Sequence, residues 1–187
     1  MKYDNTTRAL RSADNKRKIL DAAFAIMEER GFDGVSVGDI TAAAGVSKGA
    51  FYIHFESKED LVDEMINLRF DPIKSRFSSG GAVERVAGFL RESVAEIESA
   101  GLKVAQKWFS DSVRSTAYGR KKLKYDEDCV REILCDFYDS AAAEAKAGSI
   151  AAFYYGILVL WCFTDGEKSA KDGIEEFNAE LLPKILA

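Results

Sequence analysis

The chain has few of the residues from which metal centres and acid–base sites are built. Among 187 residues there are one histidine and three cysteines, and the cysteines show no CxxC spacing. An odd number of cysteines without this spacing argues against both a disulfide framework and a zinc site. The sequence also lacks a nucleophile elbow and a glycine-rich phosphate loop, so we expect no metal, no cofactor and no enzymatic activity.

Proline and long apolar runs are also scarce. With 2 prolines and 47% hydrophobic residues, the composition is typical of a globular, helical chain. Its most apolar segment, IAAFYYGILVLWCF (150–163), is shorter than the roughly 20 residues that cross a bilayer as a helix. The beginning, MKYDNTTRALRSADNKRK, is polar and predicts neither a signal peptide nor a membrane anchor. We therefore expect a soluble, cytoplasmic protein with no membrane partner.

The net charge of −5 mildly disfavours a nucleic-acid partner, but the charge is unevenly distributed. Residues 1–18 contain two acidic residues and six basic ones, Lys2, Arg8, Arg11, Lys16, Arg17 and Lys18. Such a basic arm on an acidic protein can lie against a phosphate backbone. An idle, solvated terminus is an equally open interpretation of the same residues.

Apolar residues recur at helical spacing along the whole chain, and no segment alternates as a strand would. The first apolar stripe ends at Gly31, and Gly45 has the position of a left-handed residue that ends a second, short helix. The starts of several helices are marked by serines that are followed three residues later by an aspartate, at Ser36, Ser57 and Ser169. This spacing is that of a capping box.

Further boundaries follow from helix-breaking residues. Pro72 is expected to interrupt the fourth helix, and SSGGA (78–82) has the composition of a linker. The pattern breaks again at AYGRKK (117–122) and at Gly148, which is expected to separate a long amphipathic helix from the apolar helix 150–164. The latter is apolar all round and is expected to be buried on every side. These boundaries predict an all-α protein of about nine helices.

The stretch GVSKGAFYIHFESKEDL (45–61) contains the features of a helix-turn-helix motif. Two short helices are separated by four residues, Ala44 to Ser47, and Gly45 suits the positive φ that such a turn requires. Phe51 and Phe55 are four residues apart and are expected to face a small core. The basic and aromatic side chains between them then face outward, as a docking surface needs.

The segment from Lys16 to about Leu68, and above all VSVGDITAAAGVSKGAFYIHFESKEDL, closely resembles the N-terminal DNA-binding domain of TetR-type transcriptional regulators. The resemblance implies a three-helix DNA-binding domain over residues 13–73, with its motif at about 36–55, and a larger helical ligand-binding and dimerisation domain over 74–187. It also implies phosphate contacts from Ser36, Ser47, Tyr52, His54 and Lys58. Lys48, Gly49, Ala50 and Ile53 would face base edges in the major groove.

Three residues differ from the usual pattern of that family. Ala50 replaces a common Thr or Ser, Gly38 replaces an Arg that reads guanine in some members, and Thr41 replaces a packing Ala. Sequence preference then depends on Lys48, which suits guanine acceptors, and on Ile53, which suits a thymine methyl group.

Aromatic residues of the C-terminal helices are candidates for an effector pocket, although aromatics at helical spacing are more often core. The family resemblance implies such a pocket, and the candidates are Phe89, Trp108, Phe137 and Tyr154. The last two helices, 150–164 and 169–186, are expected to pair with those of a second subunit as a four-helix bundle. The interface candidates are Phe153, Leu160, Trp161, Phe177 and Leu181. Burial of helix 150–164 within its own chain is the open alternative.

Together these features predict a ligand-responsive repressor that binds a pseudo-palindromic operator as a homodimer. Its partners would be double-stranded DNA, a second copy of the chain and a small-molecule effector. The alternative is a helical ligand-binding or interaction dimer that does not bind DNA.

Overall fold

The computed structural model describes residues 2–114 and 116–187, with side chains described throughout these ranges except at residues 2–7, 111, 114 and 116–119. The described residues form ten helices and no strand, which confirms the all-α prediction. The helices are α1 (Lys2–Arg30), α2 (Val37–Ala44), α3 (Lys48–Tyr52), α4 (Lys58–Arg76), α5 (Ala82–Ala100), α6 (Leu102–Arg114), α7 (Thr116–Leu134), α8 (Ser140–Phe163), α9 (Ala170–Glu180) and α10 (Leu182–Ile185).

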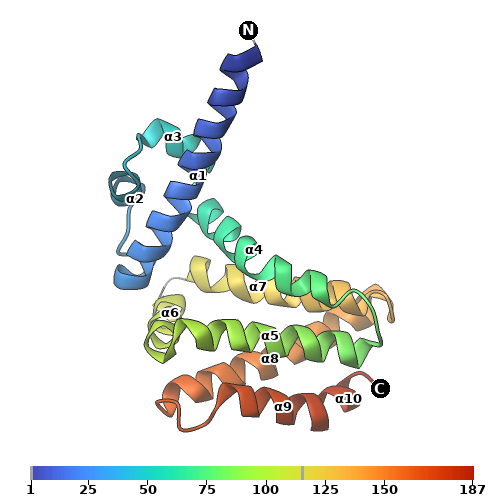
Figure 1. Cartoon of the computed structure of the whole chain (residues 1–187). Coiled ribbons are helices and arrows are strands. Elements are labelled where there is room, and N and C mark those ends of the chain that lie inside the picture. Colours follow the sequence, from blue (N-terminus) through green and yellow to red (C-terminus); the bar gives the residue numbers. More distant parts are fainter. Residues whose placement is uncertain (1, 115) are drawn as a thin grey trace.

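The molecule has two parts joined by α4 (Figure 1). The N-terminal part packs α1, α2, α3 and the first turns of α4 around a small core that includes Ile19, Ile40, Phe51 and Leu61, none of which is exposed. Because α2 and α3 are short, each depends on burying one or two large side chains against α1. The core therefore holds α3 in a fixed orientation.

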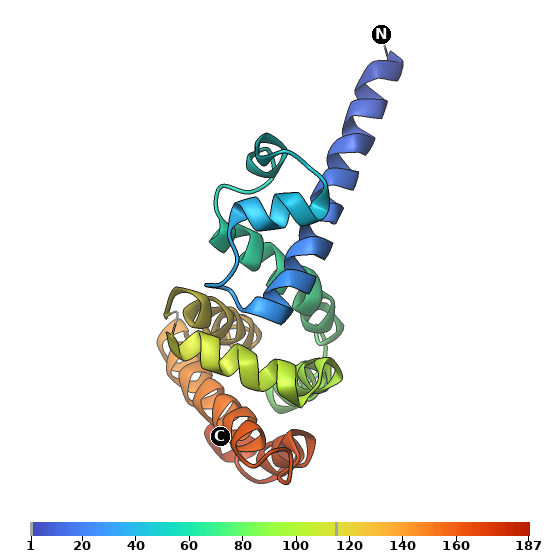
Figure 2. The ribbon, with the colours of Figure 1, turned by 90° about the vertical axis from the view of Figure 1, so that its left-hand side faces the viewer.

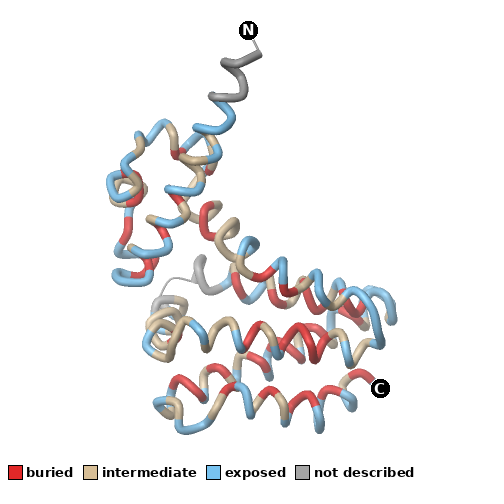
Figure 3. Tube along the Cα trace, in the orientation of Figure 1, coloured by how far each residue is buried: buried red, intermediate tan, exposed pale blue. Residues whose placement is uncertain are grey.

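The C-terminal part stacks α5, α7, α8 and α9 in layers, and buried residues gather on the sides where these helices face each other (Figures 1 and 3). Its core includes Phe89, Leu134, Leu158 and Ile174, all fully buried. The two cores meet along α4, where Val62 belongs to the N-terminal core and Phe70 to the C-terminal core. The predicted domain boundary after residue 73 thus falls within one continuous helix.

Three predicted boundaries are wrong. Pro72 lies inside α4, whose neighbouring residues Phe70 and Ile73 are buried in the core. A proline removes one helical hydrogen bond, and this packing holds the helix together around it. Residues 117–122 lie within α7. Gly148 lies within α8, and the break comes instead at residues 135–139, where the Asp139 side chain accepts a hydrogen bond from the backbone N–H of Ala142.

The basic N-terminal segment is helical from Lys2 and continues α1 beyond α3 (Figures 1 and 2). Several of its charges form ion pairs, either within α1 or with α4. The Lys16 ammonium lies 2.5 Å from a Glu64 carboxylate oxygen, and Asp14 pairs with both Arg17 and Lys18. These contacts lower the pKa of the Asp14 carboxyl, with the hydrogen bond from Lys18 as the largest cause. Lys2 lies outside the residues with described side chains.

The sequence predicted that the apolar helix would be buried on every side, and this prediction is wrong for α8. Phe153, Leu160 and Phe163 are 46%, 50% and 81% exposed and lie on one stripe of the helix. At 24 residues, α8 is also longer than the apolar segment suggested. Among the described helices, it alone is long and apolar enough to cross a membrane, a criterion that core helices of soluble proteins also meet.

Candidate nucleic-acid interface

The helix-turn-helix is built by local hydrogen bonds, as the sequence predicted. The Ser36 hydroxyl accepts a hydrogen bond from the backbone N–H of Asp39, and the Asp39 carboxylate accepts one from the backbone N–H of Ser36. The Ser36 hydroxyl also donates a hydrogen bond to the Asp39 carboxylate. This bond is the largest cause that lowers the pKa of the Asp39 carboxyl, and the backbone N–H of Ser36 adds to it. At the other end of α2, Gly45 has a φ of 66°, which ends the helix and redirects the chain toward α3.

Helix α3 separates its side chains into an inner and an outer face. The Ser47 hydroxyl accepts a hydrogen bond from the backbone N–H of Ala50, and Phe51 and Phe55 are buried beneath the helix. On the outer side Tyr52 is 58% and Ile53 75% exposed. This exposed apolar area at the end of α3 suits a surface that another molecule covers.

Lys48 lies across the position of Gly38. A Cβ atom built on Gly38 would lie 3.4 Å from Cε of Lys48 and 3.6 Å from its Nζ. The exposed lysine therefore occupies the space that a longer side chain at position 38 would need. Gly49 is also exposed and has no side chain, so the exposed side chains on the outer side of α3 are those of Lys48 and Tyr52, followed by Ile53 at the end of the helix.

His54 is half-buried and joins α3 to α1. Its Nε2 lies 3.4 Å from the Ser12 hydroxyl, so the ring is held at the edge of the surface rather than in the core. Across the described residues, no group of three or more His, Cys, Asp or Glu side chains is arranged to hold a metal ion.

Lys58 has contacts that the sequence did not suggest. Its ammonium donates hydrogen bonds to the backbone carbonyls of Phe32, at 2.6 Å, and Val35, at 2.8 Å. It also lies 3.9 Å from the centroid of the Phe32 ring. The Lys58 side chain thus holds the loop between α1 and α2 against the start of α4. A phosphate contact from Lys58 stays a prediction, and it would have to coexist with these bonds.

The four pocket candidates are not brought together. Phe89 is fully buried in the C-terminal core, and so is Tyr154, whose hydroxyl has no hydrogen-bond partner among the described residues. Phe137 is 42% exposed on the turn after α7, with the Arg85 guanidinium 5.5 Å from its ring centroid. Trp108 lines a cavity at the junction of α1, α4, α5 and α6. Sequence periodicity marks residues as inward-facing, and it does not distinguish a core from a cavity wall.

The five residues predicted for the dimer interface differ in their exposure. Phe153, Leu160 and Leu181 are exposed, whereas Trp161 and Phe177 are buried within the chain itself. Phe163, which was not among the predicted interface residues, is the most exposed of the large apolar residues on α8. Its position directly before the turn into α9 gave no signal that it would face outward.

Comparisons with known proteins agree with this geometry. Residues 19–65 match the family model described as bacterial regulatory proteins, tetR family. Over 86 residues the chain is 35% identical to the HTH-type transcriptional repressor KstR2 of Mycobacterium tuberculosis, a match that covers 43% of each chain. The chain therefore aligns with less than half the length of this curated relative.

Solved structures match nearly the whole chain, but at a lower sequence identity than KstR2 does over its shorter match. SmeT, the repressor of the Stenotrophomonas maltophilia multidrug efflux pump SmeDEF, superposes with a TM-score of 0.63 at 21% identity over 92% of this chain and 90% of its own. AibR, in complex with isovaleryl coenzyme A and operator DNA, gives a TM-score of 0.55 at 19% identity over 90% and 98%. These likenesses establish the fold. The family is indicated by residues 19–65 alone, which form a helix-turn-helix that matches the model of bacterial regulatory proteins, tetR family.

Proposed function

We propose that the protein is a transcriptional repressor that binds a pseudo-palindromic operator as a homodimer. The observation that carries the proposal is the outer surface of α3, where Lys48, Tyr52 and Ile53 are exposed above a tightly buried core. Two similar structures support it by their descriptions, since SmeT is a repressor and AibR was solved with operator DNA. We assign it a cytoplasmic regulatory role and no catalytic one.

Contacts to base edges and contacts to phosphates are made by two different sets of residues. Lys48 can donate to the O6 and N7 acceptors of guanine, and Ile53 can contact the methyl group of thymine. Ser36, Ser47, Tyr52 and His54 surround these residues and carry groups that hydrogen-bond to phosphate oxygens. Gly49 and Ala50 have little or no side chain, which allows the backbone of α3 to approach the groove.

The exposed apolar stripe of α8 supports the homodimer. Phe153, Leu160 and Phe163 recur at helical spacing on one side of this helix, and Leu181 is exposed at the end of α9. Covering such a patch with a second copy removes it from water, as in other symmetric dimers. Two copies of α3 would then enter successive major grooves, with half-site centres roughly 34–36 Å apart.

The assignment of base and phosphate contacts is tested by comparing Ile53→Ala with Tyr52→Phe. Each variant is used to select operators from a library of randomised duplexes, and its affinity for the wild-type operator is measured. We expect Ile53→Ala to relax the preference at one or two base pairs. Tyr52→Phe should weaken binding to all sequences alike, because a phosphate contact carries no base information.

Two results would contradict the proposal in different ways. An unchanged operator preference in Ile53→Ala would remove this residue from the base-contacting surface. If the wild-type chain enriches no sequence at all, the alternative of a helical ligand-binding or interaction dimer without DNA binding becomes the better account.

A further inference from the structure

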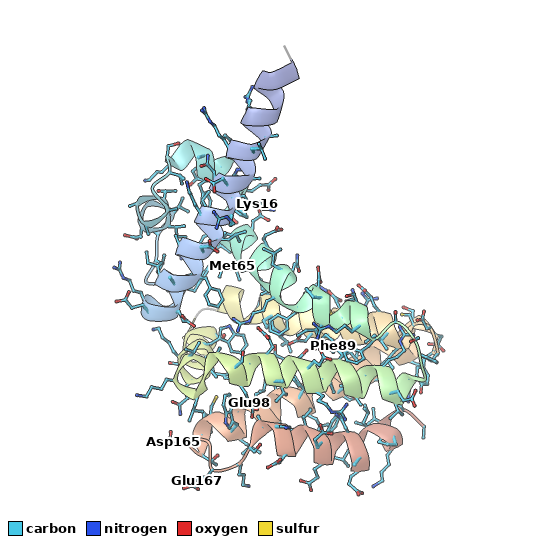
Figure 4. All side chains as sticks on the ribbon, in the orientation of Figure 1. Lys16, Met65, Phe89, Glu98, Asp165 and Glu167 are labelled. Carbon is cyan, nitrogen blue, oxygen red and sulfur yellow. The ribbon has the colours of Figure 1, made fainter. Side chains whose placement is uncertain are left out.

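A cavity of about 160 Å³ lies at the junction of the two parts of the molecule. Helices α1 and α4 form one side of it, and α5, α6 and Lys122 of α7 form the other. Met65, which lines it, lies on α4 close to where α1 passes (Figure 4). We propose that this junction cavity binds a small monocarboxylate whose apolar body is about the size of one aromatic ring. The proposal rests on the proposed function for its regulatory consequence.

The size and walls of the junction cavity define the apolar part of the ligand. An apolar protein cavity of about 150 Å³ is large enough to bind benzene, so this one has room for a single ring with a small substituent. Its walls are mainly apolar and include Phe24, Met27, Met65, Ile97 and Trp108. Aromatic and thioether groups on these walls favour a flat, apolar ligand.

Lys122 defines the polar part of the ligand. It lines the cavity, and its side chain is only 6% exposed. Its ammonium lies 2.5 Å from one Asp126 carboxylate oxygen and 3.9 Å from the centroid of the Phe70 ring. Among the described residues, Asp126 is its one hydrogen-bonding partner, although an ammonium has three donors. A ligand group that accepts hydrogen bonds and carries negative charge is therefore favoured here.

The other charges near the cavity do not oppose this assignment. Arg69 and Lys107 also line it, and the Arg69 guanidinium is paired with Glu96 at 2.6 Å. The one acidic lining residue, Glu28, is exposed at the outer edge of α1. Because Lys and Arg only donate hydrogen bonds, the donors on the cavity wall outnumber the acceptors. A cationic ligand would face three basic lining residues, Arg69, Lys107 and Lys122, and one acidic lining residue, Glu28.

The position of the junction cavity gives ligand binding a route to DNA binding. A ligand that contacts Met27 on α1 and Ile97 on α5 touches both parts of the molecule, so its binding depends on the angle between them. The carboxylate would also compete with Asp126 for Lys122. The second Asp126 oxygen accepts a hydrogen bond from the Tyr155 hydroxyl, at 2.8 Å, which extends the network to α8. A ligand that prefers one arrangement would therefore change the spacing of the two α3 helices in a dimer.

The test measures benzoate binding to the full chain by isothermal titration calorimetry in the absence of DNA, with benzyl alcohol as the uncharged probe. Val104→Phe fills the junction cavity from α6. Val113→Phe is the matched control, because Val113 lies on the same helix but lines a separate hollow between α6, α7 and α8. Lys122→Met removes the cation, and the double variant Lys122→Met with Asp126→Leu avoids leaving a buried, unpaired carboxylate.

We expect benzoate to bind the wild type and Val113→Phe equally, and Val104→Phe to lose binding. Removing Lys122, in the single or the double variant, should weaken benzoate binding on the order of 10- to 100-fold, the effect of one hydrogen bond to a charged group. Benzyl alcohol affinity should fall by less than tenfold, because its hydroxyl accepts a hydrogen bond but carries no charge. If Val113→Phe loses binding and Val104→Phe keeps it, or if benzoate does not bind at millimolar concentration, the junction cavity is not the site.

The same samples distinguish this inference from the proposed function. Operator binding of the wild type is measured by fluorescence anisotropy with and without benzoate. Operator binding without any benzoate binding would overturn the inference and leave the repressor proposal intact. Benzoate binding by a chain that binds no DNA would overturn the repressor proposal and leave the inference about the junction cavity intact.

Discussion

Replacing Lys58 by methionine separates a structural lysine from a DNA-contacting one. The family resemblance assigns this residue to phosphate, but its ammonium donates to the backbone carbonyls of Phe32 and Val35. Methionine keeps the unbranched apolar stem and removes both hydrogen bonds. If the structural role dominates, the variant should lose stability first and DNA affinity only as a consequence.

The size of the effect follows from these contacts. A hydrogen bond from a charged donor contributes about 1.5–3 kcal/mol. Lys58 is only partly buried, so water can replace part of each bond, and we expect a loss of about 2–3 kcal/mol for the pair. For a chain of this length, 1 kcal/mol corresponds to about 2–4 °C in Tm. The expected decrease in Tm is therefore about 4–12 °C.

Lys48→Met is the matched control, measured with Lys58→Met by thermal unfolding and by anisotropy against operator DNA. Lys48 is exposed on α3, so its replacement should change stability by less than about 0.5 kcal/mol. It should nevertheless weaken operator binding on the order of tenfold or more. An unchanged Tm together with weakened DNA binding in Lys58→Met would refute the structural role.

Three further predictions concern other regions. Gly45→Ala places a side chain at a φ of 66° and should destabilise the protein by about 1–2 kcal/mol in thermal unfolding; no change would mean that the turn relaxes. Leu160→Glu, on the exposed stripe of α8, should convert dimers to monomers in analytical ultracentrifugation, and a persisting dimer would exclude this face. Cys135 is exposed, while burial raises the thiol pKa of Cys129 to about 11. Cys135 should therefore react with a thiol reagent at pH 8 well before Cys129, as mass spectrometry of the labelled peptides can show.

Features that depend on neighbouring residues were predictable from the sequence. The capping box at Ser36, the N-cap at Ser57 and the left-handed Gly45 are local, because each hydrogen bond or backbone angle involves residues within one turn. The predicted box at Ser57 is only half formed, since the Asp60 carboxylate accepts a hydrogen bond from the backbone N–H of Glu56 instead of Ser57. The division of α3 into a buried side with Phe51 and an exposed side with Tyr52 follows equally from helical periodicity. These features fix the candidate interface, and they are the ones that the sequence predicted correctly.

Features that depend on distant residues were not predictable. Lys58 bonds to carbonyls 23 and 26 residues earlier in the chain, and nothing in its local sequence indicates those partners. Pro72 was expected to break α4 because propensity alone disfavours it, and tertiary packing of Phe70 overrides that preference. The junction cavity is formed by five helices, so no single periodicity could indicate it. Likewise, the burial of Trp161 but not of Phe163 is decided by packing against other helices.

Fluorescence anisotropy of the full chain against the DNA that flanks its own gene tests the central claim most directly. The titration is carried out at about 50 and 200 mM salt, with random DNA as competitor. A dimer that makes about 6–10 phosphate contacts should bind tightly, resist the competitor and lose on the order of 10³–10⁵ in affinity over this range. Binding no tighter than that of random DNA would contradict a sequence-specific regulator of this gene.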